Sequence, residues 1–423
     1  MWWQISTAVV VAILAVLATV DFHGKSQSPS PEPRKETDVK TVEKKQETPI
    51  SANLRTYVIG DLHGDIDCAK YWVNLIGVVD DIESPRRWLK NDASLVFMGD
   101  YIDKGPFSYQ TMLFVKSLTD AFPDKVTALM GNHEMEALKD RHPQRRSKFY
   151  HYSYSVVHPS EFRNFVALHR DLDDHDELVI DLLLNATLEV YARGLQQEAS
   201  FAPESKSGPC IIDFVHPQHH QDLVKTRLTE YQRVYESAFY SNTTLGKWVE
   251  TLKVAHVENG VLFTHGGIDA QIAAVLNQYE SMDALNKHVA DNAGNERFLE
   301  FLHTTETGEA IEKMLFYRGN HKQGACSELT RILDGIQGVT RLAVGHTPGK
   351  NVRELCGSQF LALDSLLGRW IRTSGNYYCP TEARKTGGFQ CPDLEEHCLG
   401  QIVMIDSDGK VRVIEADENA EQD

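Results

Sequence analysis

Five short polar motifs, each containing glycine, follow apolar runs of this 423-residue chain. They read Gly60-Asp61-Leu62-His63-Gly64-Asp65, Gly99-Asp100-Tyr101-Ile102-Asp103-Lys104-Gly105-Pro106, Gly131-Asn132-His133-Glu134, His265-Gly266-Gly267 and Gly345-His346-Thr347. Carboxylate, amide and imidazole side chains are ligands that divalent ions such as Mn, Fe and Zn accept. The sequence therefore predicts a centre that holds two divalent metal ions.

The residue types suggest how the ligands are shared between the two ions. Asp61 and His63 are two positions apart, so one turn can direct both side chains to the first ion. Asp100 is the predicted bridge, because a carboxylate can offer one oxygen to each of two cations ~3.5–4 Å apart. The predicted ligands of the second ion are Asn132, His265 and His346.

The apolar runs before the motifs are predicted to be buried strands, at residues 57–59, 94–98, 126–130 and 261–264. Ligand sites in α/β sheets form at the carboxyl ends of strands, so the motifs should converge in space. Strands alternate with helical patterns and predict a mostly parallel sheet of the α/β class. The later strands, at 342–344, 360–363, 402–405 and 411–415, are predicted to form a second sheet packed on the first.

Residues 135–255 are predicted to be a helical insertion beside the site, because the segment is too long for a loop. An apolar stripe at helical spacing supports this interpretation. It consists of Leu223, Leu228, Tyr231, Val234 and Tyr235. Three histidines in the insertion, His216, His219 and His220, are assigned to a polar surface loop, although a third metal site was the alternative.

Together the motifs resemble the calcineurin-type metallophosphoesterase superfamily. They are most similar to its phosphoprotein phosphatase branch, with the pattern GDxHG, GDxVDRG, GNHE and HGG. Residues 246–248, 315–319 and 326–365 narrow the resemblance to the Shewanella-like phosphatases, over a span from Thr56 to Asp364. The resemblance implies a four-layer α-β-β-α sandwich with a helical insertion.

The resemblance also implies a metal-dependent phosphoric ester hydrolase. The two metals would lower the pKa of a bridging water, so that it attacks phosphorus directly as hydroxide. His133 resembles the general acid that protonates the leaving oxygen, and Asp103 resembles the partner that orients it. Lys104, Arg318 and Asn132 are predicted to bind the substrate phosphate.

One residue departs from the family pattern, and it bears on the substrate. Lys104 stands where most of the branch has Arg, and Lys104-Gly105-Pro106 is typical of the related ApaH-like phosphatases. The predicted substrate is a phosphoprotein, carrying phosphotyrosine or phosphoserine/threonine, or a small phosphoester. The alternative is an ApaH-like hydrolase of polyphosphate or dinucleotide polyphosphates. A non-enzymatic alternative is a membrane-anchored pseudophosphatase binding module, which the complete ligand set disfavours.

The N-terminal part predicts a membrane or secretory segment followed by a linker. Residues 5–20 are almost wholly apolar and approach the ~20 residues that span a bilayer. Because no Lys or Arg precedes them, a signal-anchor within residues 1–24 is favoured over a cleaved signal peptide, which would give a secreted protein. Residues 25–53 predict a disordered linker. The catalytic domain is expected at 54–416, and an acidic tail at 417–423.

Cysteines and sequons favour a lumenal catalytic domain, in the secretory pathway or an organelle, although positive charge after the apolar segment argues the opposite orientation. The sequons begin at Asn185 and Asn242. Four of the seven cysteines crowd the C-terminal part and allow two disulfides in an oxidising compartment. They are Cys356, Cys379, Cys391 and Cys398. Cys68 falls among apolar helix positions and is interpreted as a buried thiol, not as a nucleophile.

The net charge limits the classes of binding partner that the sequence predicts. The chain has 43 Lys and Arg against 60 Asp and Glu, which gives a formal net charge of −17. Nucleic-acid binding favours a basic face, so no nucleic-acid partner is expected. The sequence makes no prediction of oligomeric state.

Overall fold

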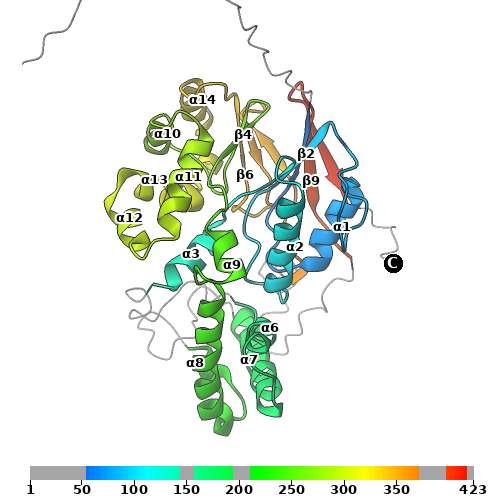
Figure 1. Ribbon diagram of the computed structural model, residues 1–423, viewed down its shortest axis with the longest axis vertical. Helices are drawn as coiled ribbons and strands as arrows, with labels where there is room; N and C mark the ends of the chain where they lie inside the picture. Colours follow the sequence, from blue (N-terminus) through cyan, green and yellow to red (C-terminus); the bar gives the residue numbers. More distant parts are fainter. Residues whose placement is uncertain (1–53, 143–156, 194–209, 371–396, 417–423) are drawn as a thin grey trace, which may run out of the picture. The chain divides into compact units, whose positions relative to one another are not determined.

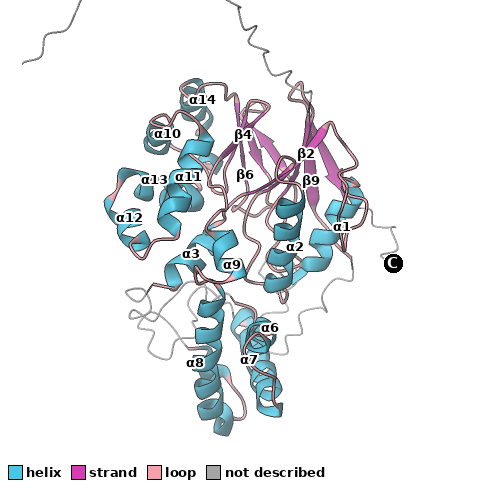
Figure 2. Cartoon of the chain, in the orientation of Figure 1, coloured by secondary structure: helices cyan, strands magenta, loops and turns pink. Residues whose placement is uncertain are grey.

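A computed structural model describes residues 54–142, 157–193, 210–370 and 397–416 (Figure 1). The predicted membrane segment, the linker and the acidic tail therefore lie outside the described residues. Across the described ranges, no helix combines the length and the apolar character needed to cross a membrane. Two five-stranded sheets, drawn in magenta in Figure 2, form the centre of the described domain.

The first sheet has the strand order β10-β9-β1-β2-β3. Its strands are β1 (Arg55–Ile59), β2 (Ala93–Phe97), β3 (Val126–Ala128), β9 (Gln401–Ile405) and β10 (Val411–Glu415). β1, β2 and β3 run parallel, with Tyr57 opposite Leu95. β9 pairs antiparallel with β1, and β10 pairs antiparallel with β9.

The second sheet has the strand order β4-β5-β6-β8-β7. Its strands are β4 (His256–Glu258), β5 (Val261–Phe263), β6 (Arg341–Val344), β7 (Arg353–Leu355) and β8 (Phe360–Ala362). β5, β6 and β8 are parallel, whereas β4 and β7 run antiparallel to their neighbours. Both sheets are therefore mixed, and the expectation of parallel pairing holds only for β1, β2 and β3 of the first sheet and for β5, β6 and β8 of the second.

The predicted membership of the last two strands is wrong. Residues 402–405 and 411–415 were expected in the second sheet, but β9 and β10 complete the first. β1 has β2 on one side only, so its other edge would leave unpaired backbone groups. β9 covers that edge, with Thr56 opposite Ile405 and Val58 opposite Val403.

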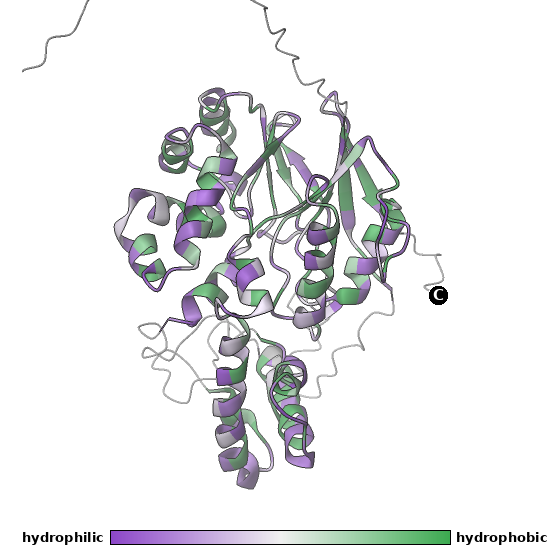
Figure 3. Ribbon diagram, in the orientation of Figure 1, coloured by the Kyte–Doolittle hydropathy of each residue, from purple (hydrophilic) through white to green (hydrophobic). Residues whose placement is uncertain are grey.

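Side chains alternate between the two faces of each strand and build the layers. Val58 and Val96 of the first sheet lie in one buried cluster with Phe263 and Ala343 of the second, so this cluster is the core between the sheets. The neighbouring residue Tyr57 belongs instead to the larger cluster that includes the helices. Figure 3 shows the strands as largely hydrophobic. The four-layer sandwich predicted from the sequence is confirmed.

Helices cover the outer faces of the two sheets (Figure 1). Beside the first sheet lie α1 (Ile66–Ile76) and α2 (Ser108–Ala121). Beside the second lie α10 (Ala270–Leu276), α11 (Met282–Ala293), α12 (Phe298–Thr304), α13 (Glu306–Phe316), η3 (Gly319–His321) and α14 (Cys326–Asp334). α1 begins where the Asp65 side chain accepts the backbone N–H of Cys68, and it ends at Gly77 in the left-handed conformation.

The described part of the segment predicted as a helical insertion consists of helices joined by turns. Its elements are α3 (Asn132–Asp140), α6 (Glu161–Ala167), α7 (Asp174–Ala192), η1 (Ile211–Phe214), η2 (Gln218–His220), α8 (Gln221–Ala238) and α9 (Thr244–Val249). α8 contacts α6 and α7, and it buries Leu228, Tyr231 and Tyr235 of the predicted stripe. Leu223 and Val234 are half-buried at the edge of that stripe.

Two disulfides correct the cysteine assignments. Cys68 is not a free thiol, because it is bonded to Cys398 and so ties α1 to the turn before β9. Cys356 is bonded to Cys326 of α14. The sequence allowed either two disulfides or unpaired thiols among the four C-terminal cysteines, and the placement of β9 beside β1 brings Cys398 to α1. Cys379 and Cys391 lie outside the described residues.

Candidate active site

The six predicted metal ligands converge at the carboxyl ends of the strands. Each is at least 93% buried. Asp61 and His63 follow β1, Asp100 follows β2, Asn132 opens α3, His265 follows β5, and His346 follows β6. The two sheets meet there because their parallel strands present their carboxyl ends to the same region.

Asp100 lies at the centre of this group. Its Oδ2 is 3.6 Å from His63 Nε2 and 3.7 Å from His133 Nε2. Its Oδ1 is 3.2 Å from His265 Nε2. Asp100 thus belongs to two sets whose donor atoms lie within 4.8 Å of one another, one with His63 and His133 and one with His265 and His346. This is the arrangement that a carboxylate shared by two metals requires.

The other predicted ligands lie around these two sets. Asp61 Oδ2 is 4.0 Å from His63 Nε2, on the side of the first set. Asn132 Oδ1 is 3.0 Å from His265 Nε2, and the rings of His265 and His346 are 5.1 Å apart. The His346 backbone N–H donates to both Asp61 oxygens, at 3.2 and 3.0 Å. That contact joins the loop after β6 to the loop after β1.

Backbone carbonyls fix the orientation of two histidines. His63 Nδ1 lies 3.1 Å from the Ile102 carbonyl, and His265 Nδ1 lies 2.8 Å from the Met98 carbonyl. A carbonyl oxygen can only accept, so Nδ1 carries the proton in each ring. Nε2 is then the ring nitrogen that faces the site in each histidine, as in metal-binding histidines.

The backbone of the site is strained at several positions. Five non-glycine residues have a positive φ: His63 (45°), Asp100 (54°), Asp103 (67°), Lys104 (67°) and His346 (62°). Such conformations are uncommon outside glycine and cluster at functional sites. Two glycines allow close approach, since a Cβ at Gly131 or Gly345 would fall on a carboxylate oxygen, of Asp100 or of Asp61.

Glu134 supports the site and was missed as a functional residue by the sequence reasoning. Its carboxylate accepts the backbone N–H groups of Gly131 (2.9 Å), Asp100 (2.9 Å) and Tyr101 (2.8 Å). It therefore holds the loop after β2 against the start of α3. Burial, with the charge of Asp100, raises its pKa to about 7. The sequence feature that could have identified Glu134 is its position directly after Asn132-His133, in the first turn of a helix.

Charge in the site is compatible with bound cations. Burial and the neighbouring Asp364 raise the pKa of Asp61 well above its usual range. Burial also acts to raise the pKa of Asp100. The nearby His265 and His133 have the larger, opposite effect and hold the pKa of Asp100 well below its usual range. Burial opposes protonation of His265, yet Asp100 raises its pKa to about 9. Asp61, Asp100 and Asp364 are buried close together, and bound cations would favour the ionised form of all three carboxyl groups.

His133 and Asp103 form a pair beside the predicted ligands. His133 Nδ1 is 2.5 Å from Asp103 Oδ2, and its Nε2 faces Asp100. The second oxygen of Asp103 accepts the Tyr235 hydroxyl of α8 at 3.2 Å. The Asp103 backbone N–H donates to Ser108 Oγ at 3.0 Å. The structure thus brings the predicted acid and its partner together, and it adds Tyr235, which the sequence reasoning placed only in an apolar stripe.

The two predicted phosphate-binding cations lie on different loops of the site. Lys104 is half-buried, and its Nζ is 2.9 Å from His63 Nε2. Arg318 is exposed and donates to Thr347 Oγ1 at 3.2 Å, next to His346. A positive side chain therefore stands beside a ligand of the first set and another beside a ligand of the second.

Other supporting residues were also missed. The Asn320 side chain bonds both backbone groups of Ile268 and so fixes the loop after His265. Arg369 donates to both oxygens of Asp65, the residue that caps α1 just after His63. These contacts join segments far apart in the sequence, and no local pattern reports them.

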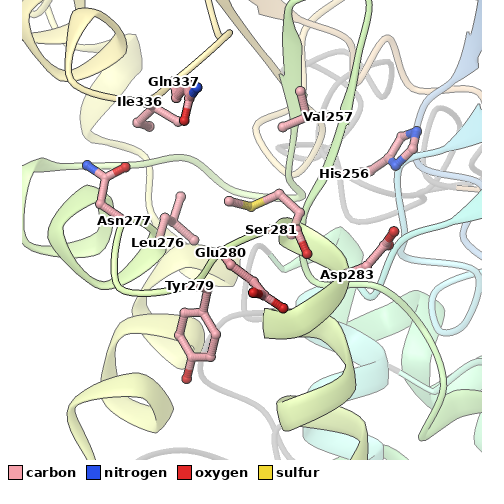
Figure 4. A pocket seen from close by; sticks show the side chains of 11 residues that line it. His256, Val257, Leu276, Asn277, Tyr279, Glu280, Ser281, Asp283, Ile336 and Gln337 are labelled. Carbon is pink, nitrogen blue, oxygen red and sulfur yellow. The ribbon is translucent and has the colours of Figure 1, made fainter. Parts of the chain in front are cut away.

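A separate cavity of about 400 Å³ lies between β4 and the connection from α10 to α11 (Figure 4). Its lining includes His256, Tyr279, Glu280 and Asp283. None of the residues predicted to bind metal or phosphate lines it, so it is distinct from the site at the strand ends.

Comparison with known proteins agrees with the geometry. The family model described as calcineurin-like phosphoesterase matches residues 54–222, which include Asp61, His63, Asp100, Asn132 and His133. This chain contains a calcineurin-like metallophosphoesterase domain. Members of that family are hydrolases that use divalent metals, and the two donor sets around Asp100 are its candidate ligand groups here.

Similarity to individual proteins and solved structures covers more of the chain than the family model does. An uncharacterized protein of Schizosaccharomyces pombe is 25% identical over 317 residues, which cover 73% of this chain and 72% of that protein. The structure of a cold-active protein tyrosine phosphatase of a psychrophilic Shewanella species has a TM-score of 0.47 at 17% identity, covering 85% of this chain and 80% of that one. A putative diadenosine tetraphosphatase has a TM-score of 0.31 at 14% identity, covering 87% and 96%.

Proposed function

We propose that this chain is a dinuclear-metal phosphatase that hydrolyses phosphomonoesters by direct attack of water on phosphorus. The observation that carries the proposal is Asp100, because one of its oxygens faces His63 and His133 while the other faces His265, which forms a second donor set with His346. The proposed ligands are Asp61, His63, Asp100, Asn132, His265 and His346. Two divalent cations bound there would neutralise charge on the phosphoryl group and make water more acidic.

The other side chains have defined tasks in this proposal. His133 donates a proton from Nε2 to the leaving oxygen, while Asp103 at 2.5 Å holds Nδ1 and keeps the ring in one orientation. Lys104 and Arg318 bind the phosphoryl oxygens as negative charge grows on them in the transition state. Asn132 offers its amide to the same group. Water attacks directly, so no protein nucleophile is needed.

Phosphoproteins are the substrate class that we propose. The motifs resemble the Shewanella-like phosphatases, and Arg318 is exposed at the edge of the site, where a bulky substrate can reach it. The second candidate is hydrolysis of polyphosphate or dinucleotide polyphosphates, which Lys104-Gly105-Pro106 favours. A lysine is a point charge without the bidentate geometry of arginine, and it suits a chain of phosphates as well as a single one.

A substrate panel tests the proposal. The chain is stripped with a chelator and reloaded with Mn²⁺, and p-nitrophenyl phosphate, a phosphotyrosine peptide, a phosphoserine peptide and polyphosphate are compared at equal phosphate concentration. We expect turnover only after reloading, with a higher kcat/KM for a phosphopeptide than for polyphosphate. The reverse order would favour the ApaH-like reaction. Retention of a phosphopeptide without turnover of any substrate would favour the non-enzymatic binding module.

Lys104→Ala should lower kcat/KM for phosphomonoesters, whereas Lys104→Arg should preserve it. Loss of a charged donor to a phosphoryl oxygen costs on the order of 2–4 kcal/mol where water is excluded. Arginine adds a bidentate contact, so polyphosphate hydrolysis should fall relative to phosphopeptide hydrolysis. Steady-state kinetics on the panel measure both effects, with Lys287→Ala on the surface as the control. An unchanged kcat/KM for every substrate in Lys104→Ala would show that Lys104 does not touch phosphate.

We also propose that the catalytic domain lies in an oxidising, lumenal compartment. The bonds Cys68–Cys398 and Cys326–Cys356 support this, because structural disulfides persist mainly in such compartments. Asn242 is exposed just before α9, where a glycan would have room. The chain expressed in its own cells should lose mass on treatment with a glycan-removing amidase, and Asn242→Gln should remove most of that shift. A chain that carries free thiols at all four cysteines and no glycan would contradict the proposal.

A further inference from the structure

A hydroxyl of the helical insertion contacts the pair formed by His133 and Asp103. Tyr235 of α8 is 1% exposed, and its hydroxyl donates to Asp103 Oδ1 at 3.2 Å. The other oxygen of Asp103 lies 2.5 Å from His133 Nδ1. The carboxylate is therefore held on both oxygens, by the proposed acid on one side and by the insertion on the other.

The turn that carries Asp103 needs such support. Asp103 and Lys104 both have a φ of 67°, a conformation that costs free energy in residues with a side chain. A second element of the insertion holds the same turn. Glu161 of α6 accepts the backbone N–H groups of Ser108 at 2.6 Å and Tyr109 at 3.3 Å, and Ser108 Oγ accepts the Asp103 N–H.

We propose that Tyr235 is a positioning residue for proton donation, so that the helical insertion takes part in building the catalytic acid. The proposal rests on the proposed function in one respect, that His133 is the acid. A carboxylate bonded through one oxygen can rotate, and the imidazole that it holds then rotates with it. A donor on the second oxygen fixes the carboxylate plane and so the direction of His133 Nε2 toward the leaving oxygen.

The chain offers a matched control one helical turn away. Tyr231 of α8 is fully buried, and its hydroxyl donates to a carboxylate oxygen of Asp176 at 2.8 Å. Asp176 is paired with Arg170 inside the insertion and does not contact the catalytic pair. Tyr231→Phe and Tyr235→Phe thus remove the same group from the same helix. Packing is retained in both, since Tyr231 stacks on Phe162 and Tyr235 lies against Phe165.

Kinetics of the full chain, loaded with Mn²⁺, provide the first test. Tyr235→Phe should lower kcat on a phosphoserine peptide roughly tenfold, a part of the ~10²–10⁴-fold that general acid catalysis contributes. The loss on p-nitrophenyl phosphate should be smaller, because its leaving group needs little protonation, and KM should change little. Tyr231→Phe should leave both values at the wild-type level. In a His133→Ala background, Tyr235→Phe should have no further effect.

Proton NMR of metal-free protein labelled with ¹⁵N-histidine tests the contact without any turnover. The His133 Nδ1–H resonance, assigned by its loss in His133→Ala, should shift in Tyr235→Phe and stay in place in Tyr231→Phe. Equal losses on both substrates, a loss that persists without His133, or an unshifted resonance would overturn the inference. If wild-type protein hydrolyses none of the substrates, the proposed function fails and the resonance alone decides the role of Tyr235.

Discussion

Asp100→Asn should abolish phosphoester hydrolysis and lower the metal content of the protein. Asparagine keeps the shape of the side chain but removes its charge, and it replaces one acceptor oxygen by an NH₂ group. Whichever way the substituted amide is turned, its NH₂ group faces one or more of the histidines whose Nε2 atoms lie 3.2–3.7 Å from the Asp100 oxygens. Loss of residues that merely support metal ligands costs ~10–100-fold in affinity, so loss of the bridging carboxylate should cost more than that.

Metal analysis by plasma mass spectrometry, together with kcat on p-nitrophenyl phosphate, measures both effects of Asp100→Asn. Asp92→Asn is the control, because Asp92 is a surface carboxylate that pairs with Arg55. It should keep wild-type activity and metal content. Two metals per chain with undiminished turnover in Asp100→Asn would remove the basis of the proposed ligand set.

His133→Ala should separate proton donation from metal binding. If His133 is the acid, the variant keeps both metals and loses roughly 10²–10⁴-fold in kcat on alkyl phosphates, whose leaving groups need a proton. Aryl phosphates with acidic leaving groups should lose much less. The geometry raises a competing role, since His133 Nε2 lies 3.7 Å from Asp100 Oδ2 and falls in the first donor set.

The same two measurements distinguish these roles of His133. A ligand would be needed equally for every substrate, and its loss would release metal. An acid would be needed mainly for poor leaving groups, with the metal content unchanged. His303→Ala, on the surface of α12, is the control for substitution of a histidine. Equal loss on both substrate classes together with a lowered metal content would assign His133 to the metal.

The convergence of the site could be predicted from the sequence because its signal is local. Each motif stands directly after a short apolar run, and the carboxyl ends of such strands meet at one edge. That rule alone was enough to predict that Asp61, Asp100 and His265 lie close together. The layers were implied by the family resemblance, and the structure agrees with it, because Val58 and Tyr57 face two different buried clusters.

Pairing between distant segments could not be predicted. The run at 402–405 has the pattern of a buried strand, but alternation does not say which edge it covers, and β9 joined β1 more than three hundred residues away. The bond from Cys68 to Cys398 follows from that pairing. The sequence predicts that a residue in an apolar stripe is buried, but it does not predict which group the polar atom of that residue will contact. Tyr235 is such a residue, since only the tertiary fold brings its hydroxyl to Asp103.

The central claim, a pair of metals bridged by Asp100, is tested most directly by a crystal structure of the protein grown with Mn²⁺. Data collected on both sides of the Mn absorption edge locate the ions without reference to the protein. We expect two anomalous peaks ~3.5–4 Å apart, with one Asp100 oxygen directed to each. The first should have Asp61 and His63 beside it, and the second Asn132, His265 and His346. A single peak, or two peaks that Asp100 does not join, in crystals of active enzyme would contradict the proposal.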